Sequence, residues 1–261
     1  MQRLCIQANT RLPQDVKDTI AAARRAEDWS VAQDILDKII ENYSIGGDTL
    51  IRQDTGMACV FLEIGQDVHI NGPLTEAVNE GVRRGLYRRL PAQVGGPGSA
   101  GPGEHRGQYP RHGVHRTGPG EQVKITVASK GFGSENMSRI AMLKPSDGLD
   151  GVKQFIPGDG GAGGLNPCPP IVVGVGTAAP STSAPCWPSG HPLREMGTHN
   201  GSPFYARLEQ ELLEKINALG IRTPGASAGR THRAGGTDRD DAHHIAGLPC
   251  AVNINCHVPG M

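Results

Sequence analysis

The sequence has few aromatic residues, few cysteines, no net charge and no long apolar run. Phe, Trp and Tyr make up 4% of the 261 residues, and 26 Lys and Arg balance 26 Asp and Glu, so no net field attracts nucleic acid or an anionic membrane. No stretch approaches the roughly 20 apolar residues of a membrane-spanning helix, and the N-terminus lacks the basic-then-apolar order of a signal peptide. We therefore expect a cytoplasmic protein with no nucleic-acid and no membrane partner. Six cysteines are too sparse for a secreted disulfide scaffold, which leaves metal or cluster ligation, or small core residues.

Glycine and proline are abundant instead, with 37 and 20 residues, and they gather in four stretches without hydrophobic periodicity. Those stretches are residues 89–120, 157–165, 177–192 and 222–242. Taken at face value, they are low-complexity linkers that bury too little apolar surface to become ordered. Four such linkers are unexpected in one domain, because structureless loops longer than about 12–15 residues are uncommon in compact folds.

The remaining segments predict an α/β fold in a single domain over residues 1–261. Short apolar runs predict strands at residues 57–64, 122–128, 170–176 and 250–256. Helical periodicity over residues 13–43, with a possible cap at Ser30, predicts an apolar face. It is formed by Val31, Ile35, Ile39 and Tyr43, with Leu36 and Ile40 beside them. A second helix opens at Ser202 and Pro203 and ends at Gly220. Its apolar register is Phe204, Leu208, Leu212, Ile216 and Leu219.

A polar elbow interrupts the apolar run "LIRQDTGMACVFLEIG" that begins at residue 50. It consists of Arg52, Gln53, Asp54, Thr55 and Gly56. Asp54 stands at the entrance of a predicted strand, so it could be a catalytic carboxylate or a residue that caps a turn.

The cysteine motifs offer candidate ligands. Cys168 in "NPCPP" follows an Asn-Pro turn and precedes a predicted strand, where prolines would hold a thiolate rigidly, although a buried thiol in a turn is an equal alternative. Cys250 and Cys256 lie six residues apart, so a continuous strand would point both thiols to one side. With His243, His244 and His257 nearby they suggest a zinc site, but the motif lacks a second close cysteine pair.

The segment "SKGFGSEN" at residues 129–136 contains two glycines two residues apart, followed by a serine. Backbone N–H groups of such a segment can bind an anion. The spacing is neither that of a P-loop nor that of a dinucleotide-binding motif, and an ordinary turn is the commoner outcome.

Several long motifs, in this order, closely resemble the alpha subunit of iron–sulfur hydro-lyases, the class I fumarate hydratases and their relative L(+)-tartrate dehydratase. They are "QDTGMACVFLEIGQDVHI", "ITVASKGFGSENMSRIAMLKPSDG", "NPCPPIVVGVG", "PFYARLEQELLEKINALGI" and "HIAGLPCAVNINCHV". The resemblance extends from "RLCIQAN" at residue 3 to "NINCHV" at residue 258. Relative to the family, the chain begins within the first helix and ends just past Cys256.

The resemblance implies a 4Fe-4S cluster held by three cysteines, with an open iron that acts as a Lewis acid. It places two ligands on Cys168 and Cys256, whereas the third family position is occupied by Arg52. A guanidinium group cannot ligate iron, because it stays protonated and has no acceptor. Cys59, seven residues further on, could replace the missing thiolate only if its strand brought it to the same iron.

The resemblance also implies a reaction and the residues that serve it. The reaction is the reversible hydration of fumarate to (S)-malate, a step of the tricarboxylic acid cycle, with L(+)-tartrate dehydration as the alternative. Gln53 and Asp54 match the substrate-contact and proton-handling positions, Gly133 a backbone contact to a carboxylate, and His244 a substrate contact. A separate beta subunit is expected to complete the site in a hetero-oligomer.

A hypothesis about the gene would account for the four glycine- and proline-rich stretches. Residues Gly96 to Val114, back-translated with permitted codons and read one base out of register, give text close to the family's "DPLDRVNTGDNTPA". The hypothesis is that these stretches are frame-shifted segments. If the expressed chain carries them, a catalytically impaired, partly disordered relative and a zinc-binding protein are the alternatives to an active hydro-lyase.

Overall fold

The computed structural model describes residues 1–45, 51, 57–89, 113–158, 171–177, 198–219, 233–235 and 247–256. These residues belong to two compact units. Unit 1 draws on Met1–Pro13 and Asn42–Phe132, and unit 2 on Gln14–Glu41 and Gly133–His257. Among the helices in the described part of the chain, none combines the length and the apolar character that crossing a membrane requires.

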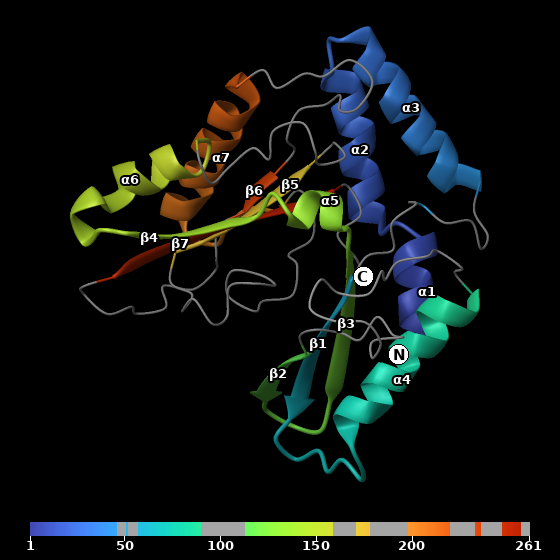
Figure 1. The fold of residues 1–261 in the computed structure, drawn as a ribbon. Coiled ribbons are helices and arrows are strands. Elements are labelled where there is room, and N and C mark those ends of the chain that lie inside the picture. The colour runs from blue at the N-terminus through green and yellow to red at the C-terminus, as the bar shows by residue number, and fades with distance from the viewer. Residues whose placement is uncertain are drawn as a thin grey trace, which may run out of the picture. The chain divides into compact units, whose positions relative to one another are not determined.

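Unit 1 is a three-stranded sheet with two helices packed on one face (Figure 1). Its strands are β1 (Met57–Gly65), β2 (Gly113–Gly118) and β3 (Val123–Lys130), in the order β2-β1-β3. β1 runs parallel to β2 and antiparallel to β3. The helices are α1 (Gln2–Thr10) and α4 (Leu74–Arg89).

Alternation along β1 creates the core of unit 1. Because successive strand residues point to opposite faces, every second side chain of β1 meets the helices. The core comprises Ala58, Val60 and Leu62 of β1, Val127 of β3, Cys5 and Ala8 of α1, and Val82 and Leu86 of α4. Gly85 lets α4 approach α1 closely, since a Cβ at this position would lie 2.7 Å from the Cβ of Cys5.

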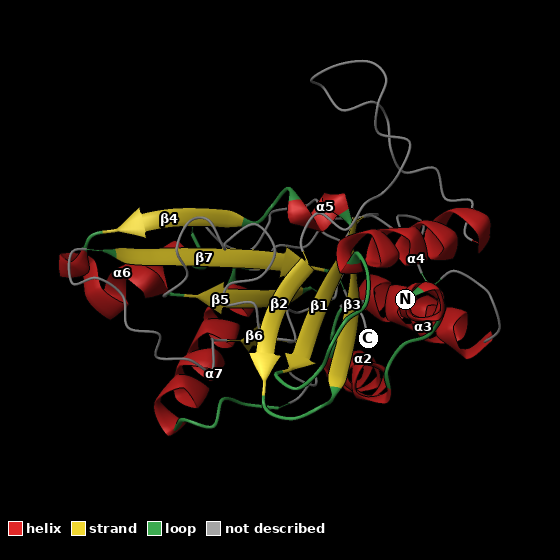
Figure 2. Ribbon diagram, turned by 90° about the horizontal axis from the view of Figure 1, so that it is seen from below, coloured by secondary structure: helices red, strands yellow, loops and turns green. Residues whose placement is uncertain are grey.

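Unit 2 contains a four-stranded sheet in the order β4-β7-β5-β6 (Figure 2). The strands are β4 (Arg139–Leu143), β5 (Val172–Gly176), β6 (Arg233–Gly235) and β7 (Leu248–Asn255). β7 is antiparallel to both β4 and β5, and β5 is parallel to β6. The short helix α5 (Phe132–Glu135) precedes β4, and a 3-10 turn (Pro145–Asp147) leads into α6 (Gly148–Phe155).

Helices α6 and α7 (Pro203–Ala218) supply the apolar side chains that cover one face of this sheet. Pro203 occupies the first turn of α7, where its missing N–H costs nothing. The core is formed by Val152 and Ile156 of α6, Leu212 and Ile216 of α7, Val173 and Val175 of β5, and Cys250, Val252 and Ile254 of β7.

The segment predicted as helical over residues 13–43 forms two helices, α2 (Gln14–Ala26) and α3 (Ser30–Ile45). The break lies at Glu27, whose carboxylate accepts hydrogen bonds from the N–H groups of Asp28 and Trp29, each at 3.1 Å. The apolar face predicted for α3 is correct only in part. Leu36, predicted beside that face, is buried together with Ala32, whereas Val31 is 40% exposed.

The four predicted strands are confirmed as β1, β3, β5 and β7, and each strand end lies within two residues of the predicted one. The helix predicted from Pro203 is confirmed as α7, although Phe204 and Leu219, predicted to face the core, are exposed. Two stretches read as linkers contain strands, since β2 lies within residues 89–120 and β6 within residues 222–242. Both are short and gain their hydrogen bonds from distant parallel partners, which leaves no local periodicity to detect.

Candidate functional site

Two of the site residues predicted from the sequence lie in the described part of the chain, and both belong to unit 2. Gly133 is in α5, and Cys256 follows β7. The others lie outside the described residues: Arg52, Gln53, Asp54, Cys168 and His244. Their predicted roles therefore stay predictions.

Cys256 stands at the end of the most buried strand of unit 2. β7 is buried from Pro249 to Asn255, and Cys256 itself is 9% exposed. One face of β7 contributes Cys250, Val252 and Ile254 to the core. The alternate residues, Asn253 and Asn255, are buried as well, and Asn255 Nδ2 donates a 2.9 Å hydrogen bond to Asn253 Oδ1. The strand thus leads from an apolar core to a polar end at which the thiol of Cys256 sits.

The structure separates Cys250 from Cys256 and so corrects the interpretation of these two thiols as a zinc pair. Six residues of extended strand span about 20 Å, whereas thiolates that share one zinc ion lie within about 5 Å of each other because each Zn–S bond is about 2.3 Å. Cys250 is fully buried in the core, and burial raises its pKa to about 12. It is therefore a core residue and not a ligand.

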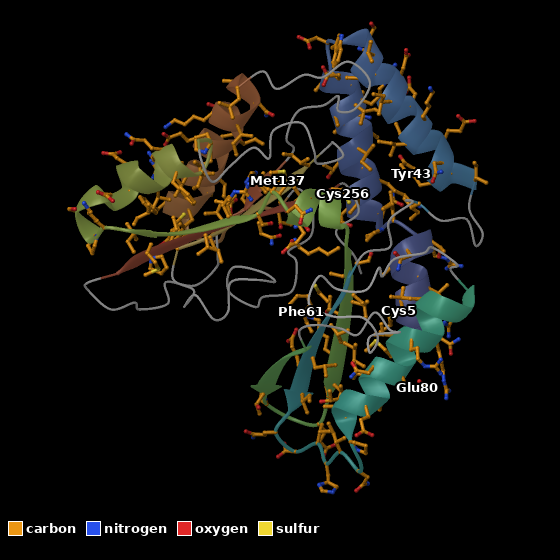
Figure 3. All side chains as sticks on the ribbon, in the orientation of Figure 1. Cys5, Tyr43, Phe61, Glu80, Met137 and Cys256 are labelled. Atoms are coloured by element: carbon orange, nitrogen blue, oxygen red, sulfur yellow. The ribbon has the colours of Figure 1, made fainter. Side chains whose placement is uncertain are left out.

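Ser138 connects the segment that contains Gly133 to the strand that ends at Cys256. Its hydroxyl oxygen accepts the N–H of Ile254 at 3.1 Å and donates to Glu135 Oε2 at 3.5 Å. The last residue pair of the β4–β7 ladder is Arg139–Val252, so the serine oxygen takes the place of a strand carbonyl just beyond it. Figure 3 labels Met137, the neighbour of Ser138, and Cys256 near α5. This link brings two sequence motifs, 116 residues apart, into one hydrogen-bonded arrangement.

Gly133 is the second residue of a four-residue helix. It is exposed, and the next residue, Ser134, is buried. The segment closes with two turn hydrogen bonds, from Met137 N–H to Ser134 O at 3.0 Å and from Ser138 N–H to Glu135 O at 2.9 Å. The backbone of Gly133 is accessible at a strand-to-helix junction, and a contact from it to a carboxylate remains a prediction.

In unit 1, the pairing of β1 with β3 defines the end of the sheet that adjoins the predicted catalytic residues. Met57 opens β1 and lies opposite Lys130, which closes β3. The polar elbow that contains Gln53 and Asp54 ends directly before Met57, and "GFG" follows Lys130. By their places in the sequence, the elbow and the glycine segment therefore adjoin the same end of the β1–β3 ladder.

The donor atoms present do not fit a cluster held by three cysteines. Position 52 carries a guanidinium group, which leaves Cys168 and Cys256 as the thiols at family positions. Cys59 is fully buried inside β1, opposite Ala128. Within the described ranges, no three His, Cys, Asp or Glu side chains gather as a metal site would require.

Sequence reasoning did not single out two residues that lie close to these motifs in the structure. Nothing in the sequence indicates the role of Ser138, because its hydrogen-bond partner is distant in sequence. Lys130 could have been noticed, since a lysine closes the apolar strand "VKITVAS". Its side chain is 2% exposed.

Comparison with known proteins gives one family and a consistent set of relatives. The profile of the family described as fumarate hydratase (Fumerase) matches residues 1–259. The putative L(+)-tartrate dehydratase subunit alpha of Methanocaldococcus jannaschii is 33% identical over 257 residues, which cover 94% of this chain and 88% of that protein. The L(+)-tartrate dehydratase subunits alpha of Escherichia coli and Shigella sonnei are each 28% identical over 254 residues, covering 95% of this chain and 83% of theirs.

Proposed function

The chain belongs to the fumarate hydratase (Fumerase) family and is a lyase, and from this premise we propose that it is the alpha component of a two-subunit hydro-lyase that reversibly hydrates fumarate to (S)-malate. The observation that carries the proposal is the match of the family over residues 1–259. The names of the relatives, which are alpha subunits of hydro-lyases, support the same class of reaction and a partner beta subunit. Both units of the chain are proposed to serve one hydro-lyase alpha domain.

The reaction adds a hydroxyl group to one carbon of a double bond and a proton to its neighbour, on a substrate with two carboxylates. Asp54 is proposed to move a proton, since a carboxylate at a strand entrance can act as a general acid or base. Gln53 and His244 would donate hydrogen bonds to the substrate, and the backbone N–H of Gly133 would bind a carboxylate. Held in this way, the substrate would meet the proton-transfer group in a fixed orientation.

The cofactor is the point at which this chain departs from its family. Family members use a 4Fe-4S cluster, and the cluster is proposed here for a chain with a thiol at position 52, together with Cys168 and Cys256. With Arg52 in place, only two of the three thiolates remain. We therefore expect the sequence as it stands to assemble a cluster poorly and to have little or no hydratase activity.

The test is to co-express the chain with its beta subunit as the native sequence and as the Arg52→Cys variant, followed by anaerobic reconstitution with iron and sulfide. The expected result is a cluster with hydration of fumarate in the variant, and much less of both in the native chain. Arg52→Ser, which removes the guanidinium without adding a thiol, is the matched control. Equal activity in the serine and cysteine variants would refute the assignment of a thiol at position 52 as a cluster ligand. No activity in the native chain or in either variant would refute the proposed function.

A second candidate function is dehydration of L(+)-tartrate. It is favoured by the relatives at 33% and 28% identity, which are named as tartrate dehydratase subunits. The ratio of kcat/KM for L(+)-tartrate and for (S)-malate, measured on the same reconstituted complex, distinguishes the two.

The frame-shift hypothesis for the glycine- and proline-rich stretches is tested separately by resequencing the gene. If all four reading frames are confirmed, the hypothesis is wrong.

A further inference from the structure

Strand β4 forms one edge of the sheet in unit 2, next to β7 (Figure 2). Two of its apolar side chains reach solvent, since Ile140 is 46% exposed and Met142 is 64% exposed. Their register partners on β7, Ala251 and Pro249, are both buried. The apolar surface therefore lies at the margin of the sheet and not at its centre.

The two exposed side chains lie on the face of the sheet opposite the helices. Leu143 packs against the core that α6 and α7 cover, and Ala141 is the register partner of Cys250 in that core. Because successive side chains of a strand alternate between its faces, Ile140 and Met142 point away from this core. They are two residues apart and thus share one apolar face.

The backbone of the same two residues faces the free side of β4. In an antiparallel pair, alternate residues direct both N–H and C=O towards the partner strand. The N–H of Ile254 reaches the hydroxyl of Ser138 on the β4 side, so the even-numbered residues of β7 bond to β4, and the register leaves the even-numbered residues of β4 facing outward. Pro249 opposite Met142 agrees with this, because proline has no N–H to donate. Ile140 and Met142 therefore direct their N–H and C=O groups away from the sheet.

These outward groups are available to another strand. In the part of the chain that the structure describes, the N–H and C=O groups of Ile140 and Met142 have no hydrogen-bond partner. An edge strand with free backbone groups is a template on which an extended segment can add. Edge strands are commonly protected by a charge or a proline within the strand, and between Arg139 and Lys144 the sequence has neither.

Two cations flank this free edge. Arg139 opens β4 and Lys144 follows it, and both are exposed. The guanidinium group of Arg139 donates to the carbonyl oxygens of Asn136 and Ser138, at 2.7 and 2.9 Å, and these bonds do not neutralise its charge. The carboxylate of Asp147 accepts the backbone N–H of Lys144. Neither cation forms an ion pair within the described ranges.

The flanking charges decide which strand fits the edge. Two copies of this chain related by a twofold axis would pair their β4 strands antiparallel, with Ile140 of one copy opposite Met142 of the other. Arg139 of each copy would then adjoin Lys144 of the other, and like charges repel over a range of about 8 Å at physiological ionic strength. A different strand, apolar in its middle and acidic at its ends, matches both the exposed side chains and the charges.

We propose that the free edge of β4 is a docking site for the beta subunit, which adds an extended apolar segment with acidic ends; this inference rests on the proposed two-subunit function. The relatives are named as alpha subunits, which supports a partner chain of this kind. The backbone of the added segment pairs with Ile140 and Met142, and its apolar side chains cover theirs. Its acidic ends meet Arg139 and Lys144.

Hydrogen exchange of the β4 amides, resolved by mass spectrometry with fragmentation, tests the docking directly. The chain alone is compared with its complex with the beta subunit. In the free chain, the N–H groups of Ile140 and Met142 should exchange quickly, whereas that of Ala141 is protected in the ladder to β7. In the complex, both outward N–H groups should exchange about tenfold more slowly or less still.

Two results of this experiment would overturn the proposal. One is exchange at Ile140 and Met142 that the beta subunit leaves unchanged. The other is slow exchange at both residues in the free chain, because another segment of the same chain would then occupy the edge.

Substitutions at Met142 test the backbone pairing. Met142→Pro removes one outward N–H without removing a bond to β7, and Met142→Ala, which keeps this N–H, is the matched control. The Kd for the purified beta subunit, measured by calorimetry, should be about threefold to tenfold higher for the proline than for the alanine variant, as expected for one hydrogen bond. Should the proline variant fail to fold, Met142→Lys carries the measurement, since a charge within the apolar edge opposes strand addition. A Kd equal to that of the alanine variant would refute the pairing.

Charge reversal tests the acidic ends of the added segment. Lys144→Glu should raise the Kd about threefold or more at low salt and less at high salt, because salt screens the attraction. Arg207→Glu is the control, since Arg207 is an exposed cation on α7, which covers the opposite face of the sheet. Equal effects of the two reversals would contradict the proposed charges of the partner.

Assembly and activity fail in different ways. A chain that dimerises by itself in light scattering, and that Met142→Lys makes monomeric, shows that a second copy occupies the edge and overturns the proposal, as does a beta subunit that does not bind. A complex that hydrates fumarate but whose Kd does not respond at Met142 refutes only the docking site. A complex that forms through β4 and shows neither hydratase nor dehydratase activity with Arg52→Cys refutes the function and leaves the docking site in place.

Discussion

Replacing Ser138 by alanine should destabilise unit 2 and disturb the strand that ends at Cys256. The hydroxyl oxygen of Ser138 accepts the N–H of Ile254 at 3.1 Å, a distance within the normal range for such a bond. Ile254 is 0% exposed. Alanine removes the acceptor and leaves a buried backbone donor beyond the last ladder pair of β4 and β7.

The magnitude follows from which groups lose their partners. A buried donor left without an acceptor costs about 1–3 kcal/mol. The bond from Ser138 to Glu135 adds little, since at 3.5 Å it is at the limit of a hydrogen bond. For a chain of this size, each kcal/mol corresponds to roughly 2–4 °C in Tm. The expected loss is therefore about 1–3 kcal/mol and several degrees.

The assay is denaturant unfolding followed by circular dichroism, with Ser202→Ala as the matched control. Ser202 precedes α7, and its side chain makes no capping hydrogen bond, so the same substitution there should change the free energy of unfolding by less than about 0.5 kcal/mol. Ser138→Thr keeps the hydroxyl group and should restore part of the stability. Equal effects of Ser138→Ala and Ser202→Ala would refute the argued role of the hydroxyl.

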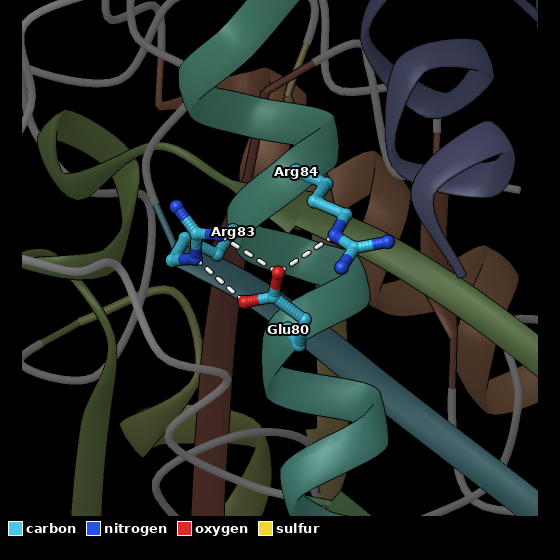
Figure 4. Close-up of polar contacts among 3 residues, drawn as sticks. All are labelled: Glu80, Arg83 and Arg84. Carbon is cyan, nitrogen blue, oxygen red and sulfur yellow. Dashed lines mark hydrogen bonds and ion pairs between the residues drawn. The ribbon is translucent and has the colours of Figure 1, made fainter.

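Three further predictions concern α4 and the core of unit 2. Arg83 and Arg84 donate hydrogen bonds to Glu80 and lower its pKa to about 2 (Figure 4). The stabilisation from these ion pairs is present above the ordinary pKa of a glutamate and is lost as the pH falls through about 2. Glu80→Gln should therefore lower Tm slightly at neutral pH, and the difference in Tm from the native chain should shrink in acid. The thiol of Cys250, with a pKa of about 12, should resist iodoacetamide at mildly alkaline pH until the protein unfolds, as mass spectrometry would show. Ile216→Ala should cost about 2–5 kcal/mol in denaturant unfolding, whereas Leu219→Ala, at a position 43% exposed, should cost far less.

The strands that sequence patterns predicted are those that lie in the middle of a sheet or bury one whole face. β1 and β7 each have a partner on both sides, so their residues must be apolar enough to be recognised from composition alone. β2 and β6 lie at sheet edges, where only a short parallel ladder holds them. Such strands depend on partners more than 45 residues away, and no local rule identifies them.

The helices show the same limit. The periodicity of α7 was sufficient to predict its existence and its start at Pro203, but not which apolar residues it buries. Phe204 precedes the part of the helix that meets the sheet and is 53% exposed, while Glu209 is buried. The carboxylate of Glu209 accepts the N–H of Asn200 at 3.3 Å, a bond to the segment before the helix that only the folded chain can form.

For the candidate site, motif order identified the family but not the geometry. The resemblance assigned residues one by one, and it could not show that Ser138 joins the segment of Gly133 to the strand of Cys256. Hydrogen bonds between residues 116 positions apart arise from strand order, which single motifs do not encode. The departure at Arg52 is the opposite case, because the chemistry of a guanidinium group is evident from the sequence and needs no structure.

The two ends of the β1–β3 ladder explain why a polar elbow precedes a buried strand. At the end where β1 finishes, Gly65 donates to Gln122 O at 2.8 Å and packs so closely on Gly120 that a side chain would collide with its carbonyl oxygen. That end is closed by backbone contacts. At the other end, Met57 and Lys130 form the terminal pair, and the polar residues 52–56 directly precede Met57 in the sequence. The polar elbow therefore adjoins the end of the ladder opposite to the glycine contact.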